Sequence, residues 1–451
     1  MAGTIHRTVF LLKEALESMS VRMRISNIER ISLMVNKAMS SQARSFHTSE
    51  HIFNLADADK PIQTLAALFH DIVYFHIDKG FIEEIEMLLD PYIVVKADSV
   101  FLKKKIPNED EAITLNLAIF GFKAGDELPA FGGMNEFLSS VVMAKALQGT
   151  IDTESVLKVA ACIEATIPFR GPDETGKSPA EILFARLEVI NKDRSIGVTD
   201  EELVEAVKES VIFANRDVEN FAENRVALFL DNTWKLLPET NPSLRTTGIF
   251  TVLNYRIALQ KMEGFLGFLD PDRIFSCFRS VPLPKVYDKL VKRATRNVIA
   301  ARDYLGIKLL TTGILEAIAM ISGGDAPIAL FMGDVSDKEE IAKFENMLPV
   351  NGKKGSMSST IRDLLAQGRN SSTDFDLKNS PLANYLYSNL TMKTYGDYLQ
   401  NAKAMFDNKM KPKKFLDNLP KKLILPVVKA CSEMAFTRRK SLSDYIQQRK
   451  K

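Results

Sequence analysis

Residues 46–76, FHTSEHIFNLADADKPIQTLAALFHDIVYFH, hold four of the five histidines in the 451-residue chain. These four are His47, His51, His70 and His76. We expect His47 and His51 to share one face of a helix, because they lie four residues apart. A second helix, beginning at Pro61, should carry His70 and the adjacent Asp71 at its far end. Imidazole and carboxylate are usual ligands of first-row divalent cations, so packing of these helices predicts a metal site.

The pattern Phe46-His47-x-x-x-His51, followed by an apolar helix that ends in His70-Asp71, resembles the HD superfamily of metal-dependent phosphohydrolases. Its first half is similar to the Tyr-His-Asn-x-x-His pattern of cyclic-nucleotide phosphodiesterases. The resemblance implies that His51, His70 and Asp71 are metal ligands and that one distant aspartate completes the site. It also implies that His47 is the general acid.

The chain departs from the phosphodiesterase pattern at three positions. Phe46 replaces the tyrosine, Thr48 replaces the asparagine, and the histidine expected five residues into the His-Asp segment is displaced by one, to His76. Of the four histidines, His76 is the one that we expect to be merely structural. A satisfied core histidine is the ordinary explanation of any one of them, but four together favour a metal site. A site that binds metal without turnover is the other alternative.

The remaining ligand must be a carboxylate distant in sequence from His70. In the segment EAVKESVIFANRDVENFA the apolar residues follow helical spacing, and Asp217 lies beside that stripe. Burial of a carboxylate there without a cation would be costly, whereas a metal ion would satisfy it. We therefore predict Asp217 as the fourth ligand. Asp231 is a second candidate, and a local ion pair with Arg216 is the competing explanation of Asp217.

Two further charged residues are candidates for the site. Glu164 lies on the apolar stripe of a predicted helix over 153–167 and needs a partner, either in a salt bridge or as a catalytic base. Arg170, in the loop 168–178, is a candidate to contact a substrate phosphate, as Arg44 is. The same loop contains GPDETGKS, which matches the P-loop pattern literally, but no strand is expected before it.

Apolar residues recur at three- and four-residue spacing along the chain, and alternating runs are almost absent. We therefore expect an all-α fold, an HD-type helical bundle extended by further helices. Two helices are predicted within 7–40, and single helices over 135–148, 153–167, 201–233, 285–304 and 308–322. Capping pairs mark three helix starts, at Asn108 and Glu111, Ser178 and Glu181, and Thr199 and Glu202.

A domain boundary is expected near residues 236–248, LLPETNPSLRTTG. It would separate an HD-like metal-binding helical domain, residues 1–240, from a helical C-terminal domain, residues 241–451. The end of the second domain is basic, because residues 403–451 hold 14 Lys and Arg against 4 Asp and Glu. This tail would attract nucleic acid or an anionic membrane, but a solvated helix face with a frayed end is the explanation that we favour.

Composition indicates a soluble cytoplasmic protein. Hydrophobic residues make up 46% of the chain and the net charge is +2. The three cysteines match no CxxC pattern, which argues for a reducing compartment. The N-terminus lacks the apolar region of a signal peptide. Residues 309–334 are interrupted by Glu316 and by glycines, so we expect a buried helix followed by a turn and no transmembrane segment.

The predicted function is that of an enzyme, a metal-dependent phosphohydrolase or phosphodiesterase. It would use a divalent ion (Mn, Fe, Mg or Zn) to activate water against a small phosphorylated substrate such as a nucleotide. The alternative is a helical binding or regulatory protein that keeps the histidine site for sensing a metal or ligand.

Overall fold

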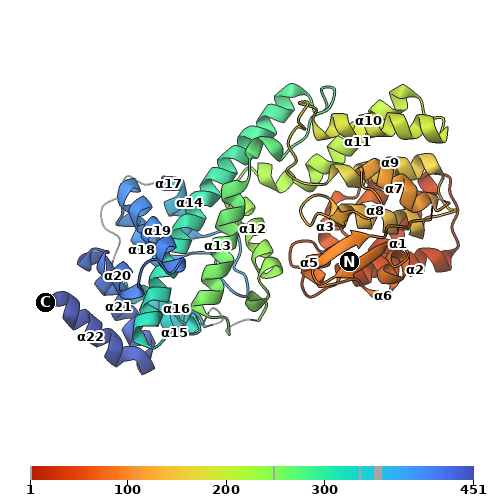
Figure 1. Cartoon of the computed structure of the whole chain (residues 1–451). Helices are drawn as coiled ribbons and strands as arrows, with labels where there is room; N and C mark the ends of the chain where they lie inside the picture. The colour runs from red at the N-terminus through yellow and green to blue at the C-terminus, as the bar shows by residue number, and fades with distance from the viewer. Residues whose placement is uncertain (1–2, 108, 247–248, 335–336, 350–357) are drawn as a thin grey trace. The chain divides into compact units, whose positions relative to one another are not determined.

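The computed structural model describes residues 3–107, 109–246, 249–334, 337–349 and 358–451. Over these residues the chain forms the α-helices α1 to α22 and three short strands (Figure 1). The expectation of a mostly helical protein is confirmed. The strict all-α class needs one correction, because β1 (Ile93–Lys96), β2 (Ser99–Leu102) and β3 (Glu127–Leu128) form an antiparallel sheet in the order β1-β2-β3.

The chain divides into two compact units. Unit 1 comprises Met1–Ala222 and Asp270–Ala294, and unit 2 comprises Glu223–Leu269 and Thr295–Lys451. The division of the sequence into residues 1–240 and 241–451 stays a prediction.

Unit 1 contains the segment with the histidines. Besides the sheet and the first residues of α14, its helices are α1 (Thr4–Ser18), α2 (Ile25–Met39), α3 (Ser49–Leu55), α4 (Pro61–Phe69), α5 (Phe75–Asp78), α6 (Glu83–Leu89), α7 (Glu111–Phe120), α8 (Met134–Ala146), α9 (Thr153–Ala165), α10 (Pro179–Arg194), α11 (Asp200–Asp217), and the 3-10 helices η1 (Glu219–Ala222) and η3 (Pro271–Arg273).

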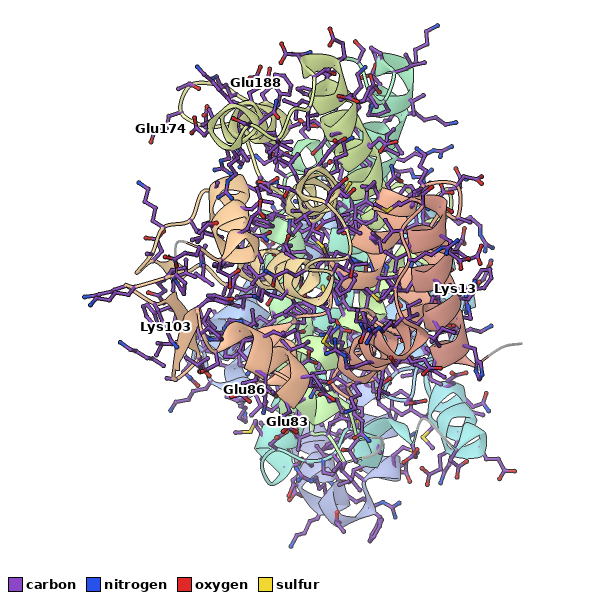
Figure 2. The ribbon with its side chains drawn as sticks, turned by 90° about the vertical axis from the view of Figure 1, so that its right-hand side faces the viewer. Lys13, Glu83, Glu86, Lys103, Glu174 and Glu188 are labelled. Carbon is purple, nitrogen blue, oxygen red and sulfur yellow. The ribbon has the colours of Figure 1, made fainter. Side chains whose placement is uncertain are left out.

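Helix α9 is the centre of unit 1. It packs against α4, α8 and α11, and side chains on all its faces between Val156 and Glu164 are buried. Helix α4 is also buried from Gln63 to Phe69. A helix that is apolar all round belongs in a core. Most charged side chains lie outside this core, as the labelled Lys13, Glu83 and Glu188 show in Figure 2, while Glu164 of α9 is buried within it.

Side-chain caps begin several helices of unit 1. The predicted capping boxes of Ser178 with Glu181 and of Thr199 with Glu202 are confirmed, and α4 has Pro61 in its first turn. The predicted cap Asn108 lies outside the described residues, and α7 follows Asp110. The single helix predicted over 201–233 is wrong, because α11 ends at Asp217.

Among the described residues of unit 2, the regular elements are helices. Its elements are α12 (Val226–Thr240), η2 (Pro242–Leu244), α13 (Val252–Phe268), the larger part of α14 (Pro284–Ser322), α15 (Ala329–Met332), α16 (Lys338–Met347), α17 (Ser359–Gln367), α18 (Pro381–Ser388), α19 (Met392–Phe406), α20 (Pro412–Asp417), α21 (Lys421–Met434), η4 (Phe436–Arg438) and α22 (Arg439–Lys450).

Helix α14 replaces the two helices that were predicted over 285–304 and 308–322. It is long and apolar enough to cross a membrane by length and composition, but 83% of its apolar window is buried inside the protein. It ends before Gly323 and Gly324, which both have positive φ. The predicted buried helix followed by a turn is therefore confirmed.

Candidate metal centre

The predicted ligands come from three helices of unit 1. His51 lies in α3, His70 is the C-cap of α4 with Asp71 directly after it, and Asp217 is the last residue of α11. Helices α3, α4 and α11 pack against one another, which brings residues 166 positions apart into one group. The carbonyl ends of α4 and α11 therefore face the same group, and helix C-termini favour a cation.

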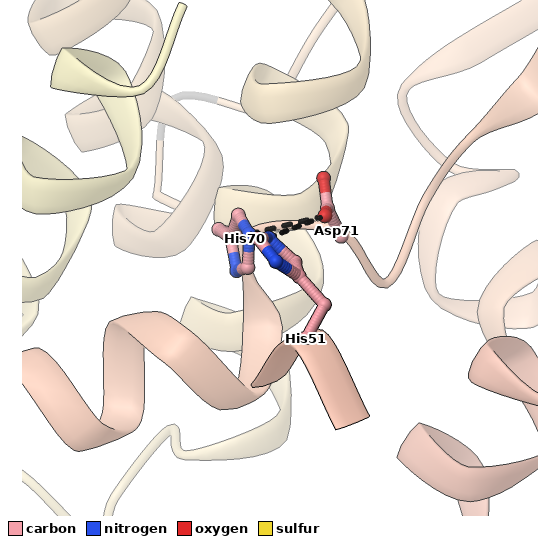
Figure 3. A group of neighbouring side chains, drawn as sticks. All are labelled: His51, His70 and Asp71. Carbon is pink, nitrogen blue, oxygen red and sulfur yellow. Dashed lines mark hydrogen bonds and ion pairs between the residues drawn. The ribbon is translucent and has the colours of Figure 1, made fainter. Parts of the chain in front are cut away.

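Four ring and carboxylate atoms converge in this group, and Figure 3 shows the three residues that are close in sequence. His51 Nε2 lies 2.9 Å from Asp217 Oδ1 and 3.3 Å from His70 Nε2. His70 Nε2 lies 3.0 Å from Asp71 Oδ2 and 3.5 Å from Asp217 Oδ1. Ligand atoms about 2.1 Å from one ion are roughly 3.0–3.4 Å apart in octahedral or tetrahedral coordination. The spacing therefore suits a divalent cation.

The hydrogen bonds around His70 direct a lone pair at this point. Its Nδ1 lies 3.0 Å from the Ala67 carbonyl oxygen, which can only accept, so Nδ1 carries the proton. A neutral His70 would then present an unprotonated Nε2 to the Asp71 and Asp217 carboxylates, whereas an imidazolium would donate from Nε2 to them. Asp71 Oδ2 is buried, and no hydrogen bond reaches it from the described residues. Without a metal ion, a proton on His70 Nε2 links the ring to these carboxylates, and a divalent cation can take the place of that proton.

The pKa shifts of these residues also indicate that the group attracts positive charge. Burial lowers the pKa of His70, but the Asp71 and Asp217 carboxylates outweigh it and hold that pKa well above 6.5. Burial raises the pKa of Asp217, but hydrogen bonds from His51 and His70 lower it to about 2. Burial also raises the pKa of Asp71, and the neighbouring His70 brings it far below its usual range. Two ionised carboxylates thus attract positive charge, which a divalent ion would supply.

Packing fixes the orientation of these side chains. The Phe213 ring meets the His70 ring edge to face, with centroids 5.9 Å apart, and Phe213 lies one turn before Asp217 on α11. The buried Arg44 donates to the Asp71 carbonyl oxygen at 2.7 Å and pairs with Asp78. Arg44 therefore holds the His-Asp turn, and the structure places its guanidinium against protein groups and not toward a substrate.

His47 lies beside the group but in a different way from the one expected. Helix α3 begins at Ser49, so the prediction that His47 and His51 share a helix face is wrong. The two rings still lie 6.2 Å apart, and the His47 ring packs edge to face on Tyr74, with centroids 4.7 Å apart. His47 is also near enough to lower the pKa of Asp71. His76 is exposed and its Nε2 bonds to the Asp98 carbonyl oxygen.

Glu164 and Arg170 form an ion pair with each other, which explains both charges as part of the fold. Glu164 is 1% exposed, and Arg170 Nη1 lies 2.6 Å from its Oε1. Arg170 Nη2 also donates to the Glu164 Oε2, and Arg186 lies 3.6 Å from Oε1. Of the two roles considered for Glu164, a salt bridge or a catalytic base, these contacts support the salt bridge. Its role as a catalytic base and the phosphate contact of Arg170 stay predictions that this pairing does not favour.

The competitors of Asp217 have other partners. Arg216 pairs with Asp57 at 3.5 Å and contacts Gln63, so a local ion pair does not account for Asp217. Asp231 belongs to unit 2, where it accepts from the Ser371 backbone and hydroxyl. The GPDETGKS segment follows α9 and not a strand, so its P-loop context is missing.

We expect Arg170→Ala to destabilise unit 1 by roughly 3 kcal/mol, because it leaves the buried Glu164 carboxylate with only the longer contact to Arg186. Chemical denaturation would measure the change. The matched control is Lys158, a half-buried lysine that pairs with Glu154 at i,i+4 on the surface of α9, and Lys158→Ala should cost less than about 0.5 kcal/mol. Equal losses in the two variants would contradict the structural role of Arg170.

Comparison with known proteins adds no relative to this picture, since no family model, curated protein or solved structure matches the chain.

Proposed function

We propose that this protein is a metal-dependent phosphohydrolase of the HD type. The observation that supports the proposal best is the convergence of His51, His70, Asp71 and Asp217, four residues from three helices, within ligand distance of one another. They are the residues for which the sequence pattern and its resemblance to HD phosphohydrolases predict metal binding.

The donor set indicates which ions suit the centre. Two imidazole nitrogens and two carboxylate oxygens favour Mn²⁺, Fe²⁺ or Zn²⁺, while Mg²⁺ prefers an all-oxygen set. Bound there, such an ion would lower the pKa of a coordinated water and act as a Lewis acid on a phosphoryl oxygen.

His47 supplies the other half of the chemistry. The attacking water forms a new P–O bond while the bond to the leaving oxygen breaks, and that oxygen needs a proton. Imidazole has an unperturbed pKa of ~6.5, which makes histidine the usual side chain for proton transfer near neutral pH. Its place beside the ligands, on the Tyr74 ring, fits a proton donor. We further propose that the substrate is a small phosphorylated molecule, for example a nucleotide, and that the protein acts in the cytoplasm.

A substrate screen tests this function. Purified protein would be loaded with Mn²⁺, Fe²⁺, Zn²⁺ or Mg²⁺ and assayed with cyclic nucleotides, guanosine tetraphosphate, deoxynucleotides and non-nucleotide phosphoesters. We expect metal-dependent release of phosphate or nucleoside monophosphate that stops on chelation. Retention of the metal without hydrolysis of any of these would favour the non-catalytic alternative, a protein that keeps the centre for binding or sensing.

A further inference from the structure

Unit 1 has a small pocket at the end of α9. Its walls are residues 165–170, the last turns of α11 around Asn215, and the segment from Arg273 to Ser276. The pocket spans about 340 Å³, part of which is open to solvent. The described residues that line it include two arginines and no Asp or Glu. A concave site of this size with cationic side chains fits a small anion or one anionic group of a larger molecule.

Hydrogen bonds hold the walls of this pocket in place. Asn215 Nδ2 donates to the Ser276 carbonyl oxygen at 2.9 Å, and Asn215 Oδ1 accepts from the Ser276 backbone N–H at 2.8 Å. In the wall after α9, Arg170 donates three hydrogen bonds to Glu164. Phe169 in the same wall has a φ of +59°, a left-handed conformation that costs a non-glycine residue energy and is concentrated at binding and active sites. The fold thus keeps the pocket in a defined shape.

Arg273 is the cation of this pocket that can turn to a ligand. A Cβ on Gly171 would come within 2.9 Å of Arg273 Cζ, so the guanidinium lies directly against this glycine. The Arg273 side chain is 53% exposed and pairs with the half-exposed Asp270 at 3.2 Å. Such surface pairs contribute little to stability, so a stronger anionic partner can replace Asp270. The other arginine of the pocket, Arg170, stays bonded to the buried Glu164.

We propose that this pocket binds a phosphoryl group, either free phosphate or the phosphate of a monoester, through the Arg273 guanidinium. Guanidinium presents a rigid fork of N–H groups that matches phosphate oxygens two at a time. A phosphate monoester carries about −1.5 to −2 charge near pH 7, more than the single charge of Asp270. The pocket contains none of the four predicted metal ligands, and the inference does not rest on the proposed hydrolysis.

Calorimetric titration of metal-free, EDTA-treated protein with inorganic phosphate and with AMP, in about 0.15 M salt, tests the proposal. We expect Arg273→Gln to weaken binding of the phosphoryl group at least about tenfold, because it removes charge-assisted hydrogen bonds. Arg30→Gln, which changes an exposed arginine of α2 in the same unit, is the control with the same change of charge and should bind as the wild type.

Gly171→Ala tests the geometry without removing a charge. Its Cβ would displace the Arg273 guanidinium, so binding should weaken severalfold. The atoms that must move are the far end of a flexible side chain, so the melting temperature should stay close to that of the wild type.

Each result decides the proposal. Binding that weakens in Arg273→Gln and Gly171→Ala supports it, and the more tightly bound probe then shows whether free phosphate or a monoester is the ligand. No binding of either probe to the wild type up to about 10 mM, or equal Kd values for the wild type and Arg273→Gln, would overturn it. An unchanged Kd in Gly171→Ala would contradict the contact of Arg273 with the ligand. Because the metal is absent, none of these results depends on the proposed hydrolysis.

Discussion

Asp217→Ala is expected to weaken retention of the metal ion by more than about 100-fold, because outer-shell partners alone typically contribute 10–100-fold to metal affinity. The Asp217 carboxylate lies 2.9 Å from His51 Nε2 and 3.5 Å from His70 Nε2, so its removal takes away one of four donors and one of two negative charges. Metal content after desalting, measured by elemental analysis of the protein loaded with Mn²⁺ or Zn²⁺, would show this loss.

Glu219→Ala is the matched control. Glu219 is an exposed acid two residues beyond Asp217, in η1, so its loss changes the net charge equally without touching the group. We expect this variant to keep its metal. Equal metal content in the two variants would show that Asp217 is not a ligand.

His47→Ala should leave metal content unchanged and lower turnover by roughly 10²–10⁴-fold. The physical reason is that His47 is held beside the ligands by Tyr74 and is not one of the four converging atoms. Steady-state kinetics with the best substrate of the screen, together with elemental analysis, would measure both effects.

His76→Ala serves as the control for this second experiment, because His76 is exposed and bonds to a backbone carbonyl. It should behave as the wild type. If His47→Ala instead lost the metal, His47 would be a ligand, and its assignment as the proton donor would be contradicted.

The local part of the centre could be predicted from the sequence. Pro61 marks the start of α4, seven consecutive buried residues follow, and the helix therefore ends in the core with His70 and Asp71. Asp217 could also be predicted as a ligand from the sequence, since a carboxylate beside an apolar stripe needs a partner. The sequence does not show how close α3 and α11 lie, because that distance depends on the packing of both helices against α4.

Other features depend on long-range packing and were missed or misjudged. Glu164 has an ambiguous signal, because a buried carboxylate needs a cation but the sequence does not say which. The break expected between the helices predicted over 285–304 and 308–322 is absent from α14, where Gly306 packs closely against Tyr395.

The most direct test of the central claim is the X-ray absorption spectrum of the Zn²⁺-loaded protein. We predict a first shell of nitrogen and oxygen atoms at about 2.0–2.1 Å, with the outer-shell scattering of two imidazoles from His51 and His70. A spectrum without imidazole scattering, or an ion that is lost on desalting, would contradict the account.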